Sequence, residues 1–264
     1  MSGPIITLTT DFGLIDAYVG QVKGVILGLC PEAVVVDLTH QVPPRHILRA
    51  GLIVASSQAS FPAGTIHLAV VDPGVGTTRR ALVVSAGGHL FVAPDNGLLT
   101  PILRDHPQAR VWVISEKAYL RPCISPTFHG RDIFAPAAGH LAAGLSPALL
   151  GPEIDDPVRL DLDQPRWEGQ ILKGQVLFSD HFGNLITNIT AAQLDRAGLP
   201  GAPRFKLAGQ ILTGLHLTYA EVKPGKPLAL IGSLDLVEIG VNQGRADEFF
   251  QAGEGAAVEV IWGV

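Results

Sequence analysis

The stretch TIHLAVVDPGVGTTRR at residues 65–80 carries the clearest information about the fold. Its first part, residues 65–71, is a mostly apolar, β-branched run, which is typical of a strand in a parallel sheet. A loop follows in which Pro73, Gly74 and Gly76 enforce a sharply turned backbone. Asp72 and the arginines at positions 79 and 80 place opposite charges at the two ends of this loop.

We interpret this loop as one that holds chemical groups. The alternative is a glycine-rich turn with a surface ion pair. The loop is neither a P-loop nor a dinucleotide-binding fingerprint, because both the Gly-Lys-Ser/Thr and the Gly-x-Gly-x-x-Gly patterns are absent.

Apolar runs and amphipathic stretches alternate on both sides of this segment. Residues 5–9, 33–38, 81–85, 90–93 and 111–114 favour strands, whereas residues 17–29 and 46–60 favour helices, and another helix runs from after Phe128 to near Gly144. This alternation predicts an α/β domain with a mostly parallel sheet. The run Val34-Val35-Val36 suggests a strand that is buried on both faces.

The pattern breaks between residues 151 and 167, where Pro152, Pro157 and Pro165 favour a linker. Short apolar runs separated by turn residues follow at 169–179, 185–189, 204–207, 228–231, 234–239 and 256–262. This spacing predicts a smaller all-β, barrel-like domain. We therefore expect an α/β domain over residues 1–155 and a β domain over residues 168–264.

The composition indicates a small-molecule partner. A net charge of −5 and a charged fraction of only 16% argue against a nucleic-acid groove and a membrane-binding surface. No run of about 18 apolar residues is present, and the N-terminus shows no leader pattern. Cys30 and Cys123 suggest buried thiols rather than a disulfide, so we expect a cytoplasmic protein.

Several polar residues follow predicted strands, which is where open α/β sheets bind their ligands. Asp11 could accept two hydrogen bonds from a ribose diol, although Asp11 and Asp16 could instead cap a helix. For Asp95 and Asn96 we favour a helix-capping role. His129 stands at a predicted helix start and could meet the Asp72 loop, but a lone histidine is more often structural.

Two polar segments interrupt the β domain. Asp180, Phe182 and Asn184 could form an ordinary hairpin turn, or the phenyl ring and the amide could contact a purine. Ser233 and the segment 242–244 are a second polar group, which turn chemistry also explains.

Five ordered motifs together resemble the S-adenosylmethionine hydroxide adenosyltransferase family. They are TTDFG at 9–13, DPGVGTTR at 72–79, PDNGLL at 94–99, FHGRD at 128–132 and DHFGN at 180–184, and they span nearly the whole chain. The resemblance implies a homotrimer in which each site lies between the N-terminal domain of one subunit and the C-terminal domain of its neighbour. It implies hydrolysis of S-adenosyl-L-methionine to adenosine and L-methionine, with neither a cofactor nor a metal.

The resemblance also implies roles for individual residues. The catalytic set falls on Asp72, Arg79 and His129, with Arg79 preferred to Arg80 because it keeps the family spacing. The substrate contacts fall on Asp11 for the ribose, Asp16 for the methionyl end, Asp180 for the amino group, and Phe182 and Asn184 for adenine; Ser233 completes the binding set.

Halogenating relatives of this family carry a tyrosine where this chain has Asp72, and an insertion after Val84. A carboxylate would repel a halide, so the sequence favours water as the nucleophile. The alternatives are a chloride-using halogenase that forms 5′-chloroadenosine, a non-catalytic adenosyl-binding protein, and a metal-dependent hydrolase that uses Asp11, Asp16, Asp72 and His129.

Overall fold

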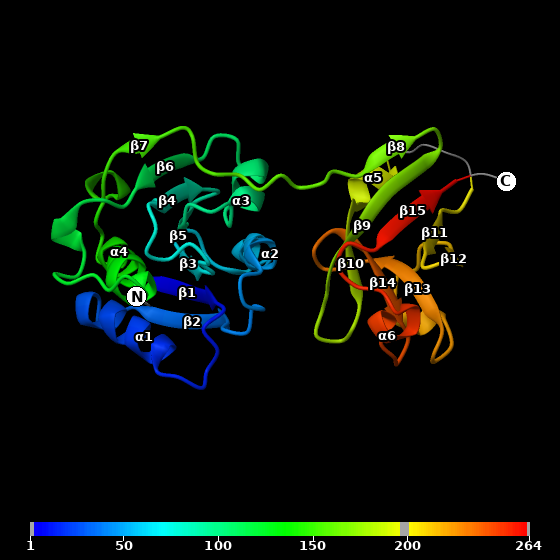
Figure 1. Ribbon diagram of the computed structural model, residues 1–264, viewed down its shortest axis with the longest axis horizontal. Coiled ribbons are helices and arrows are strands. Elements are labelled where there is room, and N and C mark those ends of the chain that lie inside the picture. Colours follow the sequence, from blue (N-terminus) through cyan, green and yellow to red (C-terminus); the bar gives the residue numbers. More distant parts are fainter. Residues whose placement is uncertain (1–2, 196–200, 263–264) are drawn as a thin grey trace. The chain divides into compact units, whose positions relative to one another are not determined.

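The computed structural model describes residues 3–195 and 201–262, which divide into two compact units (Figure 1). The N-terminal unit ends at Leu160 and the C-terminal unit starts at Asp161. Each unit contains one sheet, mixed in the first and antiparallel in the second. The predicted fold class is therefore confirmed.

The N-terminal unit has a seven-stranded sheet in the order β2-β1-β3-β5-β4-β6-β7. Strands β1, β2, β3 and β5 run parallel, and β4, β6 and β7 extend the sheet with antiparallel pairs. The strands are β1 (Ile5–Thr10), β2 (Val34–Thr39), β3 (Ile66–Val70), β4 (Ala81–Ala86), β5 (His89–Pro94), β6 (Arg110–Val113) and β7 (Glu153–Ile154), and the helices are α1 (Tyr18–Leu29), α2 (Ile47–Ser57), α3 (Thr100–Asp105) and α4 (Ala135–Ala142).

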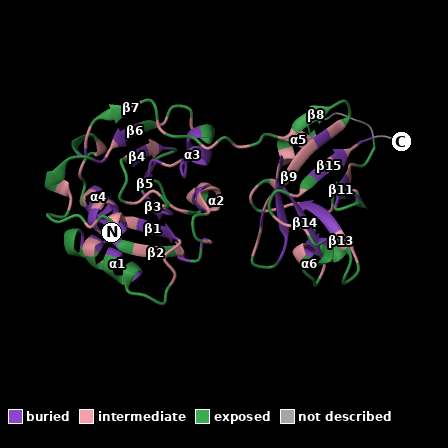
Figure 2. Cartoon of the chain, in the orientation of Figure 1, coloured by how far each residue is buried: buried purple, intermediate pink, exposed green. Residues whose placement is uncertain are grey.

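Helices cover both faces of this sheet, and β3 shows why its run is continuously apolar. Ile66, Leu68 and Val70 pack into the cluster that includes α1 and α4, whereas Ala69 and Val71 pack into the cluster that includes α2 and α3. Every residue of β3 is buried (Figure 2). The central strand therefore needs apolar side chains on both of its faces.

The expectation for Val34-Val35-Val36 is wrong. These residues form part of β2, which is an edge strand, and Val34 is 45% exposed. An edge strand is covered less completely than a central one, although the residue types in the two runs are alike.

The C-terminal unit is an eight-stranded antiparallel sheet in the order β12-β11-β15-β9-β10-β14-β13, with β8 paired to β9. The end strands β12 and β13 contact each other, so the sheet curls into a nearly closed barrel around one apolar cluster. The strands are β8 (Arg166–Glu168), β9 (Ile171–Ser179), β10 (Leu185–Thr190), β11 (Arg204–Leu207), β12 (Gln210–Thr213), β13 (Pro227–Ile231), β14 (Leu236–Val241) and β15 (Ala257–Ile261), and the helices are α5 (Ala191–Asp195) and α6 (Ala246–Phe250).

Other local differences from the sequence analysis concern weak patterns. The stretch interpreted as a linker contains β7, which pairs with β6, and the start of β8. β12 and α6 are only four and five residues long, and their sequences did not predict them. Cys30 and Cys123 are both free, but only Cys30 is buried, so the expectation of two buried thiols is wrong for Cys123.

No helix in the described residues combines the length and the apolar character that are needed to cross a membrane.

Candidate active site

Three acidic segments follow the parallel strands β1, β3 and β5 at the same edge of the N-terminal sheet. Asp11 comes directly after β1, Asp72 follows β3 by two residues, and Asp95 comes directly after β5. Parallel strands bring their carboxyl ends to one edge, which is where ligands bind in open α/β sheets.

Asp72 forms a two-pronged ion pair with Arg79 across the loop between β3 and β4. Arg79 Nε donates to Asp72 Oδ1 at 3.0 Å, and Arg79 Nη2 donates to Asp72 Oδ2. The side chains are only 5% (Asp72) and 9% (Arg79) exposed, which distinguishes this pair from the surface ion pair of the alternative interpretation. The Arg79 guanidinium also lies over the ring of Phe134, 5.1 Å from its centroid.

His129 completes this group. The Nδ1 atom of His129 lies 2.7 Å from Arg79 Nη2. His129 directly precedes a π-helical turn at Gly130–Phe134, which leads into α4. Burial and the Arg79 charge lower the pKa of His129, against smaller raising effects of Asp72 and Asp132. The structure therefore brings Asp72, Arg79 and His129 together, and His129 is mostly neutral at pH 7.

Two glycines allow the backbone segments that carry this group to approach their neighbours closely. A Cβ at Gly76 would lie 2.4 Å from the carbonyl oxygen of Pro126, so only glycine lets the Asp72 loop pack against this segment. Gly76 also has a φ of +79°, which disfavours other residues. A Cβ at Gly130 would lie 2.9 Å from the ring of Phe12, next to Asp11.

Arg80 belongs to a different group. Its Nε donates to Asp95 at 2.7 Å and its Nη1 donates to Asp156 at 2.8 Å. Asp95 is buried and also accepts from the Val158 amide. The predicted capping role of Asp95 or Asn96 is wrong, because α3 begins at Thr100 with Leu99 at its N-cap.

Asp11 and Asp16 do not cap α1 either. The N-cap of α1 is Ala17, and no side chain makes a capping hydrogen bond there. Asp11 instead accepts from the backbone amide of Arg45 at 3.1 Å, whereas Asp16 is exposed. In the part of the chain that the structure describes, Asp16 forms no hydrogen bond or ion pair with Asp72 or His129.

The predicted residues of the second half line one cavity of about 820 Å³ in the C-terminal unit. They are Asp180, Phe182, Asn184 and Ser233. Asp180 Oδ1 accepts from the amides of Phe182 and Asn184, each at 2.8 Å, so the segment is both a hydrogen-bonded turn and a cavity wall. Phe182 is 71% exposed and leaves a ring face open to a ligand.

Tyr219 and Glu238 line the same cavity and were missed by the sequence analysis. Tyr219 donates from its hydroxyl to Glu238, and burial raises the pKa of both groups. The one signal in the sequence is that Glu238, a charged residue, interrupts an otherwise apolar run.

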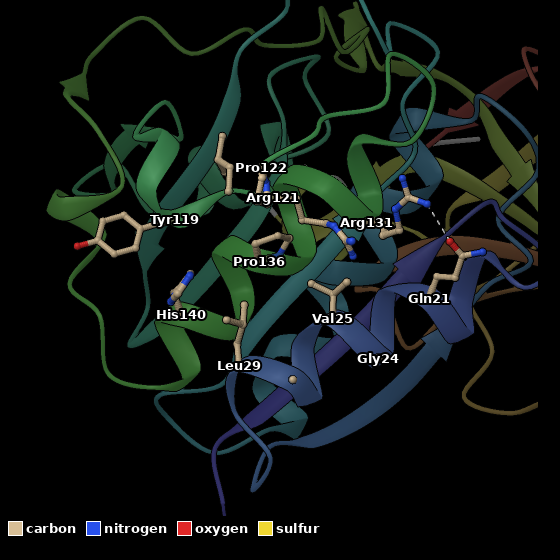
Figure 3. A pocket seen from close by; sticks show the side chains of 12 residues that line it. Gln21, Gly24, Val25, Leu29, Tyr119, Arg121, Pro122, Arg131, Pro136 and His140 are labelled. Carbon is tan, nitrogen blue, oxygen red and sulfur yellow. Dashed lines mark hydrogen bonds between the residues drawn. The ribbon is translucent and has the colours of Figure 1, made fainter.

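A second cavity, of about 610 Å³, lies between α1 and α4 in the N-terminal unit (Figure 3). Arg131 and Gln21 form a 3.0 Å hydrogen bond on its wall. None of the sequence-predicted site residues lines it. In residues 3–195 and 201–262, no group of three or more His, Cys, Asp or Glu side chains could hold a metal ion.

Two family models match the chain. The model for the SAM hydroxide adenosyltransferase N-terminal domain matches residues 6–151, and the model for the C-terminal domain of that family matches residues 174–259.

Similar proteins cover nearly the full length. An (R)-S-adenosyl-L-methionine hydrolase from Thermus thermophilus is 41% identical over 96% of this chain and 97% of its own length. A protein of that name from Salinispora tropica is 38% identical over 98% of both chains. An uncharacterized conserved protein from Thermotoga maritima has a crystal structure with a TM-score of 0.90, 33% identity, and coverage of 97% of this chain and 99% of that chain.

Proposed function

The chain belongs to the SAM hydroxide adenosyltransferase family, and from this premise we propose that it hydrolyses S-adenosyl-L-methionine to adenosine and L-methionine. The names of the similar proteins from Thermus and Salinispora support this activity and specify the (R) compound. The observation that carries the proposal for this chain is the part-buried contact of Asp72, Arg79 and His129.

The reaction is an in-line displacement at ribose C5′. A water-derived oxygen forms a bond to C5′ on the side opposite sulfur, while the C5′–S bond breaks and its electron pair stays on sulfur. Methionine leaves as a neutral thioether, and the water loses one proton. The sulfonium needs no acid to leave, so the residues act on the nucleophile.

Arg79 supplies positive charge beside the attacking oxygen. Its Nε and one Nη2 hydrogen donate to Asp72, and the second Nη2 hydrogen donates to His129. One Nη1 hydrogen donates to the Arg80 carbonyl oxygen. The other Nη1 hydrogen has no acceptor among the described residues and is available to the water. A nearby cation favours hydroxide over water, whose bulk pKa is about 15.7.

The hydrogen-bond directions assign different tasks to His129 and Asp72. A guanidinium only donates, so His129 Nδ1 accepts from Arg79, and the neutral imidazole carries its proton on Nε2. His129 therefore donates to the attacking oxygen from Nε2. Asp72 is the one member of the group with lone pairs still available, and it accepts the proton of the water.

We assign the adenosyl and methionyl contacts to residues of both units. Asp11 binds the ribose diol and Asp16 lies near the methionyl end. Asp180 binds the amino group, the cavity residues Phe182 and Asn184 contact adenine, and Ser233 of the same cavity completes the substrate-binding set. Residues 1–155 then carry nucleophile activation, and residues 168–264 carry the adenine and methionine contacts.

We propose that the protein forms a homotrimer with sites shared between neighbouring subunits. Large apolar side chains beside both groups of site residues are exposed: Leu14 at 64%, Ile15 at 99%, Phe182 at 71% and Leu217 at 89%. Exposed apolar side chains of this kind fit surfaces that an assembly covers. The two free thiols support a cytoplasmic location.

The reaction is tested with each sulfonium epimer of S-adenosyl-L-methionine in oxygen-18 water. We expect one label in the 5′-hydroxyl of adenosine and none in methionine, with turnover unchanged by EDTA. Unlabelled adenosine or no turnover would refute hydrolysis, and 5′-chloroadenosine in high chloride would reassign the reaction to halogenation. Arg79→Gln is the inactive control.

The shared site is tested by co-expressing Asp72→Ala and Asn184→Ala chains with different tags. If sites form between subunits, every trimer that contains both variants carries both intact halves at one of its three sites, or about a third of them. Doubly tagged assemblies should then regain about that share of wild-type activity. Activity no higher than the sum of the two variants would place both halves in one chain.

A further inference from the structure

A chain of hydrogen bonds runs along the wall of the C-terminal cavity, from Asp180 through Asn184 and Tyr219 to Glu238. Asn184 Nδ2 donates to Asp180 Oδ2 at 3.0 Å and to the Tyr219 hydroxyl oxygen at 3.2 Å, and Tyr219 in turn donates to Glu238. All four side chains line the cavity.

The directions of these bonds determine how the Asn184 amide faces the cavity. A carboxylate accepts and does not donate, so Asp180 requires the amide nitrogen, not the oxygen, on its side. Tyr219 gives its only hydroxyl hydrogen to Glu238, and its oxygen accepts the second amide hydrogen. Both amide hydrogens of Asn184 are thus used within the protein.

The amide oxygen is left for a ligand. Among the described residues, no group donates a hydrogen bond to Asn184 Oδ1. This oxygen is not fully buried, because it is absent from the fully buried side-chain atoms that lack a partner. The amide therefore presents only an acceptor to the cavity.

Close backbone approach holds this arrangement in place. A Cβ at Gly240 would lie 2.9 Å from the Tyr219 ring and 3.1 Å from Asn184 Oδ1, and a Cβ at Gly232 would lie 2.4 Å from Glu238 Oε2. Asn184 and Glu238 are also only 6% exposed. Little room is left for the side chains to turn.

We propose that Tyr219 and Glu238 are positioning residues that keep Asn184 Oδ1 facing the 6-amino group of adenine, and so select 6-aminopurine over 6-oxopurine substrates. This inference rests on the proposed function, which places adenine in this cavity. The 6-amino group of adenine donates, whereas the 6-oxo group of hypoxanthine accepts. A 6-oxo ligand would place two acceptors against each other and lose one hydrogen bond.

The test compares kcat/KM for S-adenosyl-L-methionine with kcat/KM for its hypoxanthine analogue, S-inosyl-L-methionine. We expect the wild-type protein to prefer the adenine compound by about 10- to 100-fold. Tyr219→Phe releases one amide hydrogen, which can then donate to a 6-oxo group, so the preference should fall to about threefold or less.

Two substitutions of Glu238 separate positioning from charge. Glu238→Leu removes the acceptor of the Tyr219 hydroxyl and should lower the preference as Tyr219→Phe does. Glu238→Gln keeps an acceptor and should retain the preference within about threefold. Leu217→Ala, at the exposed wall of the same cavity, is the control. It should lower kcat/KM for both substrates by the same factor.

Binding of adenosine and inosine by calorimetry provides a readout that needs no turnover. Loss of hydrolysis with retained base preference would refute only the proposed function. Equal effects of Tyr219→Phe on both bases would overturn the positioning role. If Glu238→Gln lost as much preference as Glu238→Leu, the charge of Glu238 rather than its hydrogen bond would be responsible.

Discussion

Arg79 Nη2 lies 2.7 Å from His129 Nδ1, and this contact joins the loop after β3 to the turn before α4. Because arginine can only donate, the contact leaves the proton of the neutral imidazole on Nε2. The same guanidinium is held by Asp72 and lies over Phe134. The orientation of the imidazole and the position of the positive charge are thus determined by one arginine.

Asp72→Asn should lower kcat by about 10²- to 10⁴-fold while KM changes by less than about threefold. The amide cannot take the proton of the water, but the adenosyl contacts remain. Steady-state kinetics measures both constants. Asp156→Asn is the matched control, since Asp156 pairs with Arg80 and its side chain is 71% exposed. A raised KM with unchanged kcat would contradict the assigned role.

Asp11→Ala should weaken adenosine binding by about tenfold or more, because it removes the proposed acceptor for the ribose hydroxyls. The same substitution should not affect 2′,3′-dideoxyadenosine, which lacks both hydroxyls. Calorimetry on the two ligands with both proteins completes the cycle. An equal loss for both ligands would mean that Asp11 acts only through the Arg45 backbone contact.

The pKa of His129 should lie below the ordinary value of 6.5, because burial and Arg79 disfavour the charged imidazole. The neutral form then persists as the pH falls to this lowered pKa, so kcat/KM should begin to fall only below pH 6.5. Arg79→Gln should raise the pKa of His129 in an NMR titration. Arg80→Gln removes an equal charge, but one that is paired with Asp95 and Asp156. This substitution should shift the pKa of His129 much less.

Phe134→Leu should lower kcat by about 5- to 20-fold, because the Arg79 guanidinium loses the ring on which it lies. Phe91→Leu is the control: both phenylalanines are fully buried, but Phe91 stacks on His67. Each substitution should cost about 1–2 kcal/mol of stability. If both variants lose activity in proportion to stability, the ring has no specific effect on Arg79.

His67 should make the protein less stable in acid. Burial and His89 lower the pKa of His67 from 6.5 to about 4, and its side chain bonds to Thr7 and His89. Below pH 6.5 the unfolded state binds more protons at His67 than the folded state does. The contribution of His67 to the free energy of unfolding is therefore complete above pH 6.5 and is lost as the pH falls to about 4. The loss amounts to roughly 3 kcal/mol.

Urea unfolding between pH 4 and 7.5 measures this dependence. His67→Gln cannot become charged, so its stability should fall less between these two pH values. His181→Gln, which alters an exposed histidine in the other unit, should keep the wild-type dependence. A wild-type pH dependence in His67→Gln would rule out His67 as its source.

Some features were open to sequence reasoning because they depend on local patterns. The strands around residues 5–9 and 65–71 and the helix after Phe128 follow from apolar periodicity, glycine and proline. The motifs containing Asp72, Arg79 and His129 could be recognised as a set, although their catalytic roles stay predictions. Capping at Asp95 failed because a more distant partner, Arg80, takes that carboxylate.

The sequence by itself determined the two-part architecture and the family, since apolar periodicity and ordered motifs are properties of the chain. Only the tertiary structure decided that Arg79 pairs with Asp72 while Arg80 pairs with Asp95, and that Tyr219 joins Asn184 to Glu238. Such choices depend on hydrogen-bond geometry between residues far apart in the chain. Neighbouring residues of the same type have identical chemistry until folding gives them different partners.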